Sequence, residues 1–248
     1  MTTTTRLSYR EAVEVLRSRQ KTSKGAPAYS RFVNRPLGRR LAAAAHVAGL
    51  SPDQVTVLSA LCTFSGIALV AIVPPSLVLA LAVAALLVLG YALDSADGQV
   101  ARLSGTGSVA GEWLDHVVDA AKIGALHIAV LVSWYRFFEV SDLVLLVPVV
   151  FLAVQALEFF AMILTDQLRR SLRGQREHFL EGQGSSSALY SLAVVPTDYG
   201  LMCLVFLLLA WREGFLVGYT LLGAAMAGFT LLALPKWYLE LRRAGRDG

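Results

Sequence analysis

Residues 77–93 read LVLALAVAALLVLGYAL, and this stretch decides the fold because it is apolar throughout and ends directly at Asp94. It has no polar face to turn toward water, and its length approaches the roughly 20 apolar residues that a helix needs to cross a bilayer. The sequence therefore predicts an all-α integral membrane protein. Similar runs predict about six transmembrane helices in total, at 54–73, 76–96, 110–135, 142–165, 195–211 and 214–236.

The composition of the whole chain agrees with a membrane location. Among 248 residues, 56% are hydrophobic and only 16% are charged. A water-soluble fold has no place for that much apolar surface. The net charge of +4 does not indicate nucleic acid as a partner, because lysine and arginine collect beside membrane spans on the cytoplasmic side.

The placement of lysine and arginine predicts the orientation in the membrane. The first 50 residues hold ten of them, and others follow the second, fourth and last spans. We therefore expect both termini and the polar end of the second span to face the cytoplasm. The expected organisation is a cytoplasmic segment at 1–50, a six-helix catalytic domain at 51–240 and a cytoplasmic tail at 241–248.

A polar segment precedes the first span. Residues 31–48, RFVNRPLGRRLAAAAHVA, predict an amphipathic helix in the headgroup plane, with Phe32 and Val33 on its apolar side. Gly49 is expected to end it. Ser51 then predicts the N-cap of the next helix, with Pro52 in the first turn and Gln54 completing a capping box.

Four aspartates interrupt the apolar pattern where the second span ends and the third begins. Asp94 and Asp97 are three residues apart, and Asp115 and Asp119 are four apart, so each pair shares one face of a helix. If the two spans are antiparallel neighbours, the pairs converge near the cytoplasmic interface. Carboxylates inside a membrane span are costly and indicate a functional site.

Four carboxylates together predict a divalent cation. Oxygen ligands favour hard ions such as Mg²⁺ or Mn²⁺ over zinc, and Mg²⁺ commonly completes its shell with substrate phosphate. Small residues between the acids, namely Gly98, Ala101 and Gly111, leave room for a nucleotide, and Arg102 can pair with a phosphate. The alternatives are ion pairs with Arg102 and Lys122, or a cation or proton transporter that uses the intramembrane aspartates.

Residues 94–119 follow the pattern D-x-x-D-G-x-x-A-R-x8-G-x-x-x-D-x-x-x-D, and this pattern resembles the signature of the CDP-alcohol phosphotransferase (CDP-alcohol phosphatidyltransferase) family. The resemblance implies a multi-pass membrane enzyme, a homodimer, that releases CMP from a CDP-activated donor as an alcohol attacks. It implies two Mg²⁺ or Mn²⁺ ions on Asp94, Asp97, Asp115 and Asp119, with Asp119 as the base. It also implies a CDP site made of Asp94, Asp97, Gly98, Ala101, Arg102, Gly111 and Asp115.

The substrates stay open at this point. The commoner role in the family favours CDP-diacylglycerol as donor, an alcohol or phosphorylated alcohol as acceptor, and phospholipid synthesis as the purpose. The alternative is a CDP-linked polar alcohol as donor, as in di-inositol phosphate synthases, which the N-terminal stretch loosely resembles.

Three weaker signals lie outside the signature. Thr56 is a candidate CDP contact, with helix capping and packing as the equal alternative. His116 is a rival base, but it projects about 100° away from Asp115 on a helix. The third signal is an arginine stripe after the fourth span, a candidate site for an acceptor phosphate or simply a consequence of topology; it consists of Arg169, Arg173 and Arg176.

Overall fold

The computed structural model describes residues 7–18, 27–173 and 197–244, and all regular elements in these ranges are helical. Arg176 lies outside the described residues. The elements are α1 (Tyr9–Ser18), the π-helical turn η1 (Ser30–Asn34), α2 (Arg35–Ala48), α3 (Pro52–Ile72), α4 (Leu77–Ser104), α5 (Val109–Phe137), α6 (Asp142–Arg173), α9 (Tyr199–Val205), the 3₁₀ segment η3 (Phe206–Ala210) and α10 (Arg212–Ala244).

Five helices, α3 to α6 and α10, are long and apolar enough to cross a membrane, which confirms the all-α membrane fold. The predicted span at 195–211 differs from the others. Its described part consists of the seven residues of α9 and the five of η3, so it is an apolar helix shorter than a full span.

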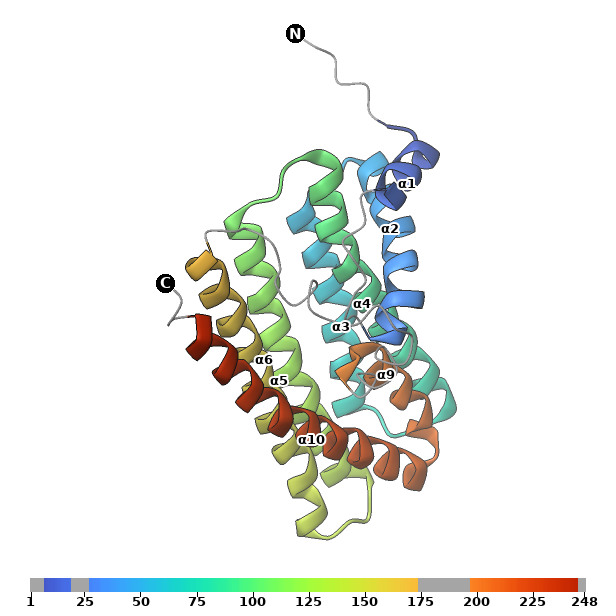
Figure 1. Ribbon diagram of the computed structural model, residues 1–248. Helices are drawn as coiled ribbons and strands as arrows, with labels where there is room; N and C mark the ends of the chain where they lie inside the picture. Colours follow the sequence, from blue (N-terminus) through green and yellow to red (C-terminus); the bar gives the residue numbers. More distant parts are fainter. Residues whose placement is uncertain (1–6, 19–26, 174–196, 245–248) are drawn as a thin grey trace.

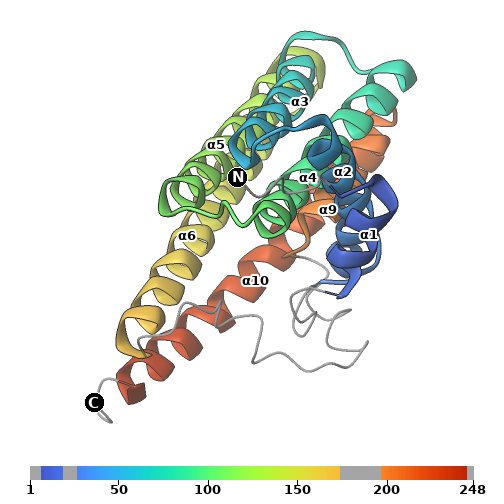
Figure 2. The ribbon, with the colours of Figure 1, turned by 90° about the horizontal axis from the view of Figure 1, so that it is seen from above.

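The helices form a closed ring. α3 packs against both α4 and α5, α5 packs against α6, α6 against α10, α10 against η3, and η3 against α4. The views in Figures 1 and 2 agree that the C-terminal ends of α6 and α10 lie side by side, at one end of the bundle. A ring of this kind encloses an interior that six segments of the chain can line.

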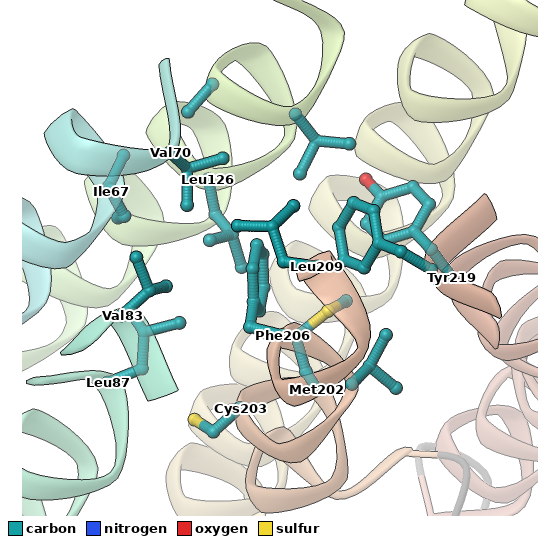
Figure 3. Packing of buried hydrophobic residues seen from close by; sticks show 14 of the residues in the cluster. Ile67, Val70, Val83, Leu87, Leu126, Met202, Cys203, Phe206, Leu209 and Tyr219 are labelled. Atoms are coloured by element: carbon teal, nitrogen blue, oxygen red, sulfur yellow. The ribbon is translucent and has the colours of Figure 1, made fainter. Parts of the chain in front are cut away.

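The main hydrophobic core fills one part of the ring (Figure 3). It includes Val83 and Leu87 of α4, Leu126 of α5 and Phe206 of η3, all buried. Asp94 follows Leu87 by two helical turns on α4, and Asp119 precedes Leu126 by two turns on α5. The core thus fixes both helices at one end and leaves the acidic ends of α4 and α5 facing each other.

The predicted helix boundaries around residue 50 are confirmed. Gly49 ends α2 with a φ of 77°, a left-handed conformation that glycine adopts without a steric penalty. The Ser51 hydroxyl accepts from Gln54 N, and the Gln54 side chain accepts from Ser51 N, which completes the capping box at the start of α3.

The segment predicted to be an amphipathic helix is helical, and it packs on the bundle through its small residues. Phe32 and Val33 are 59% and 45% exposed, whereas Asn34, Gly38 and Ala42 are buried. The α2 helix packs along α4, and Asn34 donates to the backbone oxygen of Tyr91 over 3.2 Å. Small side chains allow this close approach, and they leave the large apolar ones outside.

Candidate active site

The predicted convergence of the two acidic pairs is present in part. The side-chain oxygens of Asp94, Asp115 and Asp119 offer ligand atoms that all lie within 4.8 Å of one another, and we call these three residues the carboxylate cluster. α4 supplies Asp94, and α5 supplies the other two after the short connection at 105–108. α3 packs against both helices and so holds the two acidic segments together.

Asp97 lies next to the carboxylate cluster but forms different contacts. Its Oδ2 accepts from the Thr56 hydroxyl over 2.6 Å, and its Oδ1 accepts from the backbone N–H of Gly98 over 2.5 Å. Thr56 and Asp97 are 4% and 7% exposed. Thr56, which was predicted to contact CDP, thus donates to a signature aspartate, and its hydroxyl also donates to the backbone oxygen of Pro52 over 3.2 Å.

Lys122 is the main cation beside the carboxylate cluster. Its Nζ lies 2.5 Å from Asp94 Oδ1 and 3.1 Å from Asp119 Oδ1, and it also donates to the Ser59 hydroxyl over 3.3 Å. Lys122 is 5% exposed. The ion pairing that the sequence offered as an alternative thus exists together with the cluster, and it balances part of the buried negative charge.

The carboxylate cluster fits a divalent cation. Oxygens on opposite sides of an octahedral Mg²⁺ are about 4 Å apart, so oxygens within 4.8 Å of one another need only small shifts to bind one ion. Asp115 Oδ1 is also buried and accepts no hydrogen bond from the described residues. A buried carboxylate oxygen that accepts no hydrogen bond has lone pairs available for a metal ion.

The small residues of the signature lie on α4 and α5 beside this region. A Cβ placed on Gly98 would meet Arg102 Nη1 at 3.6 Å, so the Gly98 surface faces the arginine that was predicted to bind phosphate. A Cβ on Gly111 would lie 3.3 Å from Asp53 Oδ1, which places the start of α5 beside the start of α3. Ala101 lies on α4 between Gly98 and Arg102.

A cavity of about 640 Å³ extends from the carboxylate cluster into the ring, and we call it the central cavity. Asp94, Asp119 and Lys122 line it, together with side chains from α3, α6, α9 and α10. Several of these are large and apolar, including Phe159 and Trp237. The cavity therefore combines an acidic end with apolar sides.

The arginine stripe meets the C-terminal helix. The Arg169 guanidinium, 5% exposed and on the cavity lining, forms an ion pair with Glu240 of α10, and Lys236 Nζ lies 3.9 Å from the same carboxylate. Arg173 is the last residue of α6. Lys236 and Glu240 thus lie beside a residue that was predicted to bind an acceptor phosphate. The sequence did not indicate these two residues, because only the fold brings them to α6.

His116 faces α6 and not the carboxylate cluster. Its Nε2 lies 3.8 Å from Glu112 Oε1, and its ring contacts the Phe159 ring edge-on with centroids 6.4 Å apart. Glu112 in turn pairs with Arg170 over 2.7 Å. This placement follows from the helical rotation between residues 115 and 116.

Glu158 is a second cavity residue that the sequence interpretation missed. It is 9% exposed and lies on the cavity lining, near the middle of the apolar helix α6. Gln155 lies one turn earlier, and its Oε1 accepts from His127 Nε2 over 2.5 Å. The signal was present, because Gln155 and Glu158 interrupt an otherwise apolar run at 143–164.

Comparisons with known proteins agree with the resemblance seen in the sequence. The CDP-alcohol phosphatidyltransferase family profile matches residues 50–234. Among solved structures, the crystal structure of phosphatidylinositol phosphate synthase from Mycobacterium tuberculosis with CDP-DAG bound is similar, with a TM-score of 0.53 and 22% identity over 83% of this chain and 94% of that one. At this identity the likeness concerns the fold. A comparison with curated proteins found no match.

Proposed function

The chain belongs to the CDP-alcohol phosphatidyltransferase family, and from this premise we propose that it transfers a phosphatidyl group from CDP-diacylglycerol to the hydroxyl of an alcohol, with release of CMP, in phospholipid synthesis. The family makes it a CDP-alcohol phosphotransferase, so the transporter hypothesis loses its basis. The observation that carries the proposal is the carboxylate cluster at the end of a partly apolar central cavity.

The donor is inferred from the lining of the central cavity. Diacylglycerol brings two acyl chains, and the apolar side chains Phe159, Phe229 and Trp237 offer them a compatible surface inside the bilayer region. The similar synthase from Mycobacterium tuberculosis was crystallised with CDP-DAG, which supports the same donor class here. A CDP-linked polar alcohol used with a polar acceptor, as in di-inositol phosphate synthases, would leave this apolar lining without a partner.

Asp94, Asp115 and Asp119 would hold the divalent ion, Mg²⁺ or Mn²⁺, and Asp97 would complete the site from its position against Thr56. When bound, the ion neutralises charge on the pyrophosphate and stabilises the CMP leaving group. A second ion, as the family resemblance implies, would use the remaining carboxylate oxygens.

The chain's own residues then orient the reactants. Gly98, Ala101 and Gly111 leave space for the cytidine nucleotide, and Arg102 contacts its phosphates. Asp119 lines the cavity and takes the proton of the acceptor hydroxyl as its oxygen attacks the phosphorus next to the lipid. The P–O bond to CMP breaks, and no covalent enzyme intermediate is needed.

We also propose an orientation in the membrane and an oligomeric state. Both termini and the carboxylate cluster face the cytoplasm, the catalytic unit is residues 51–240, and the enzyme is a homodimer. The N-terminal segment packs on this unit through α2 and α4, and α10 continues to Ala244.

The proposal is tested by assaying purified protein in mixed micelles with CDP-diacylglycerol and a panel of alcohols. Metal-dependent release of CMP, stopped by EDTA and restored by excess Mg²⁺ or Mn²⁺, is expected together with a new phospholipid detected by mass. The same panel offered with CDP-linked polar alcohols should give no product. Product from those donors only would replace the proposed donor class.

A further inference from the structure

Three polar side chains form a hydrogen-bonded row from the interior of the protein to the wall of the central cavity, and we call them the His127 network. The Tyr219 hydroxyl of α10 contacts His127 Nδ1 of α5, and His127 Nε2 lies 2.5 Å from Gln155 Oε1 of α6. Tyr219 and His127 are 0% and 1% exposed, whereas Gln155 lines the cavity. The network therefore ends at the cavity in the side-chain amide of Gln155.

The two buried residues fix the orientation of this amide. Within the described residues, the Tyr219 hydroxyl has His127 Nδ1 as its one acceptor, so Nδ1 is unprotonated and Nε2 carries the ring hydrogen. That hydrogen needs an oxygen, which turns Gln155 Oε1 toward His127. The reverse orientation would leave the Tyr219 hydroxyl hydrogen buried without an acceptor, which is costly.

The nitrogen of the Gln155 amide is consequently available to a ligand. It donates to no atom of the described residues, and it keeps surface that is open to the cavity. Gln155 also lines a small recess that adjoins the central cavity. Because an amide nitrogen donates and does not accept, the matching ligand group is a hydrogen-bond acceptor.

Gln155 lies deep in the ring, near the middle of α6. It is level with His127, which follows Asp119 by two turns of α5, or about 12 Å along the helix axis. Apolar side chains that include Met202 and Leu222 line the recess beside it. The amide is thus a single oriented donor in the part of the cavity suited to the lipid portion of a substrate.

Resting on the proposed function, we propose that Gln155 donates a hydrogen bond to an ester carbonyl of CDP-diacylglycerol, and that His127 and Tyr219 are positioning residues that hold its amide in the donating orientation. An ester carbonyl accepts and does not donate, so it matches the free Gln155 nitrogen. The enzyme should therefore prefer ester-linked over ether-linked donor lipids.

The dimensions of the donor agree with this assignment. An ester carbonyl oxygen follows the reacting phosphorus by about six bonds, which span roughly 7 Å when extended. The side chains of Asp119 and Gln155 cover the rest of the distance between their helical levels. A water-soluble acceptor, in contrast, has to reach only Asp119, and its hydroxyl groups require acceptors as well as donors.

The experiment compares two donors in the full chain: CDP-diacylglycerol and a CDP-dialkylglycerol of equal chain length, whose ether bonds lack both carbonyls. Each is offered in mixed micelles at the same mole fractions with one active acceptor. The wild type should show a donor KM about five- to tenfold higher for the ether lipid at similar kcat, because one neutral hydrogen bond is lost.

Gln155→Met assigns this difference to the amide. It should raise the KM of the ester donor by the same factor and leave the KM of the ether donor unchanged. Gln167→Leu replaces an exposed glutamine of the same helix and should change neither value. Thermal unfolding of each variant reports whether the fold persists.

Tyr219→Phe tests the positioning role, because it removes the hydroxyl that sets the His127 tautomer and keeps the ring. It should raise the KM of the ester donor only, and it should add nothing in the Gln155→Met background. A merely structural role would affect both donors alike. An ester-donor KM that does not respond to Tyr219→Phe would remove the positioning role.

Three further outcomes would overturn the inference: equal donor KM values for the two lipids in the wild type, an unchanged ester-donor KM in active Gln155→Met, or an increase that falls on the acceptor KM instead. The first is measured on the wild type and does not depend on how a variant folds. All three occur with active enzyme, so they differ from failure of the proposed function, in which no CMP is released from CDP-diacylglycerol with any acceptor.

Discussion

Lys122 Nζ lies 2.5 Å from Asp94 Oδ1, and this ion pair joins α5 to α4 at the edge of the carboxylate cluster. The lysine is 5% exposed, so its charge acts almost entirely on the acids around it. A cation built into the chain lets acidic residues remain in the cavity when no metal is bound.

We predict that Lys122→Met destabilises the metal-free protein by about 3 kcal/mol, because Asp94 and Asp119 would lose their buried counter-charge. Added Mn²⁺ should recover more stability in the variant than in the wild type, since the ion replaces the missing charge. Thermal unfolding in detergent with EDTA or with Mn²⁺ measures both effects.

Lys236→Met is the matched control for this experiment. Lys236 lines the same cavity, but its side chain is 63% exposed and lies 3.9 Å from its partner Glu240, so less than about 0.5 kcal/mol should be lost. Equal losses for the two lysines would show that the Lys122–Asp94 pair has no special role.

Thr56 is predicted to act through Asp97. Thr56→Val removes the only side-chain donor to Asp97 Oδ2 among the described contacts and should cost about 1–3 kcal/mol of unfolding free energy. The donor KM should rise as well, whereas Thr56→Ser should behave like the wild type. In an Asp97→Asn background, Thr56→Val should add little to either effect, and a full additional loss would assign Thr56 a separate contact with the nucleotide.

We predict that Gly98 lacks a side chain in order to leave space for the substrate, and that helix packing does not require a glycine there. A Cβ there meets only Arg102 Nη1, at 3.6 Å, so Gly98→Ala should raise the unfolding free energy by up to about 1 kcal/mol. It should nevertheless raise the donor KM, because the methyl group occupies space meant for CDP. Gly228→Ala on α10, which has nothing within 4 Å of its Cβ, should stabilise without a kinetic effect. An unchanged donor KM in Gly98→Ala would remove Gly98 from the nucleotide site.

Arg169 is predicted to contact a phosphate on the acceptor. Arg169→Gln should raise the KM of myo-inositol phosphate and leave that of unphosphorylated myo-inositol unchanged. Because this variant also leaves Glu240 with only the exposed Lys236 as a counter-charge, the double variant Arg169→Gln with Glu240→Gln separates the two roles. The double variant should regain stability but not affinity, and regained affinity would reduce Arg169 to a structural link between α6 and α10.

Much of this arrangement could be predicted from the sequence because the signals are local. The lengths of the apolar runs predicted the five long helices. Spacings of three or four residues predicted the acidic pairs and the capping box at Ser51. The juxtaposition of Asp94 with Asp119 followed from a short connection between two antiparallel helices.

Other features depend on contacts between distant segments, so local patterns did not reveal them. Glu240 reaches Arg169 only because the ends of α6 and α10 lie side by side (Figure 2). The burial of Gly38 and Ala42 depends on how closely α2 approaches α4. The predicted fifth span contains the short helical segment Tyr199–Ala210, which changes from α-helix to 3₁₀ at Phe206, and hydropathy carries no information about that change.

The central claim is that the signature aspartates perform metal-dependent CMP release, with Asp119 as the base. The most direct measurement is the rate of CMP release from CDP-diacylglycerol at saturating Mg²⁺ by the wild type, by Asp119→Asn and by Asp142→Asn, an exposed aspartate at the start of α6. The account predicts a kcat about 100-fold or more lower for Asp119→Asn, wild-type rates for Asp142→Asn, and no release by any of them in EDTA. Wild-type rates for Asp119→Asn, or release that persists without divalent metal, would contradict it.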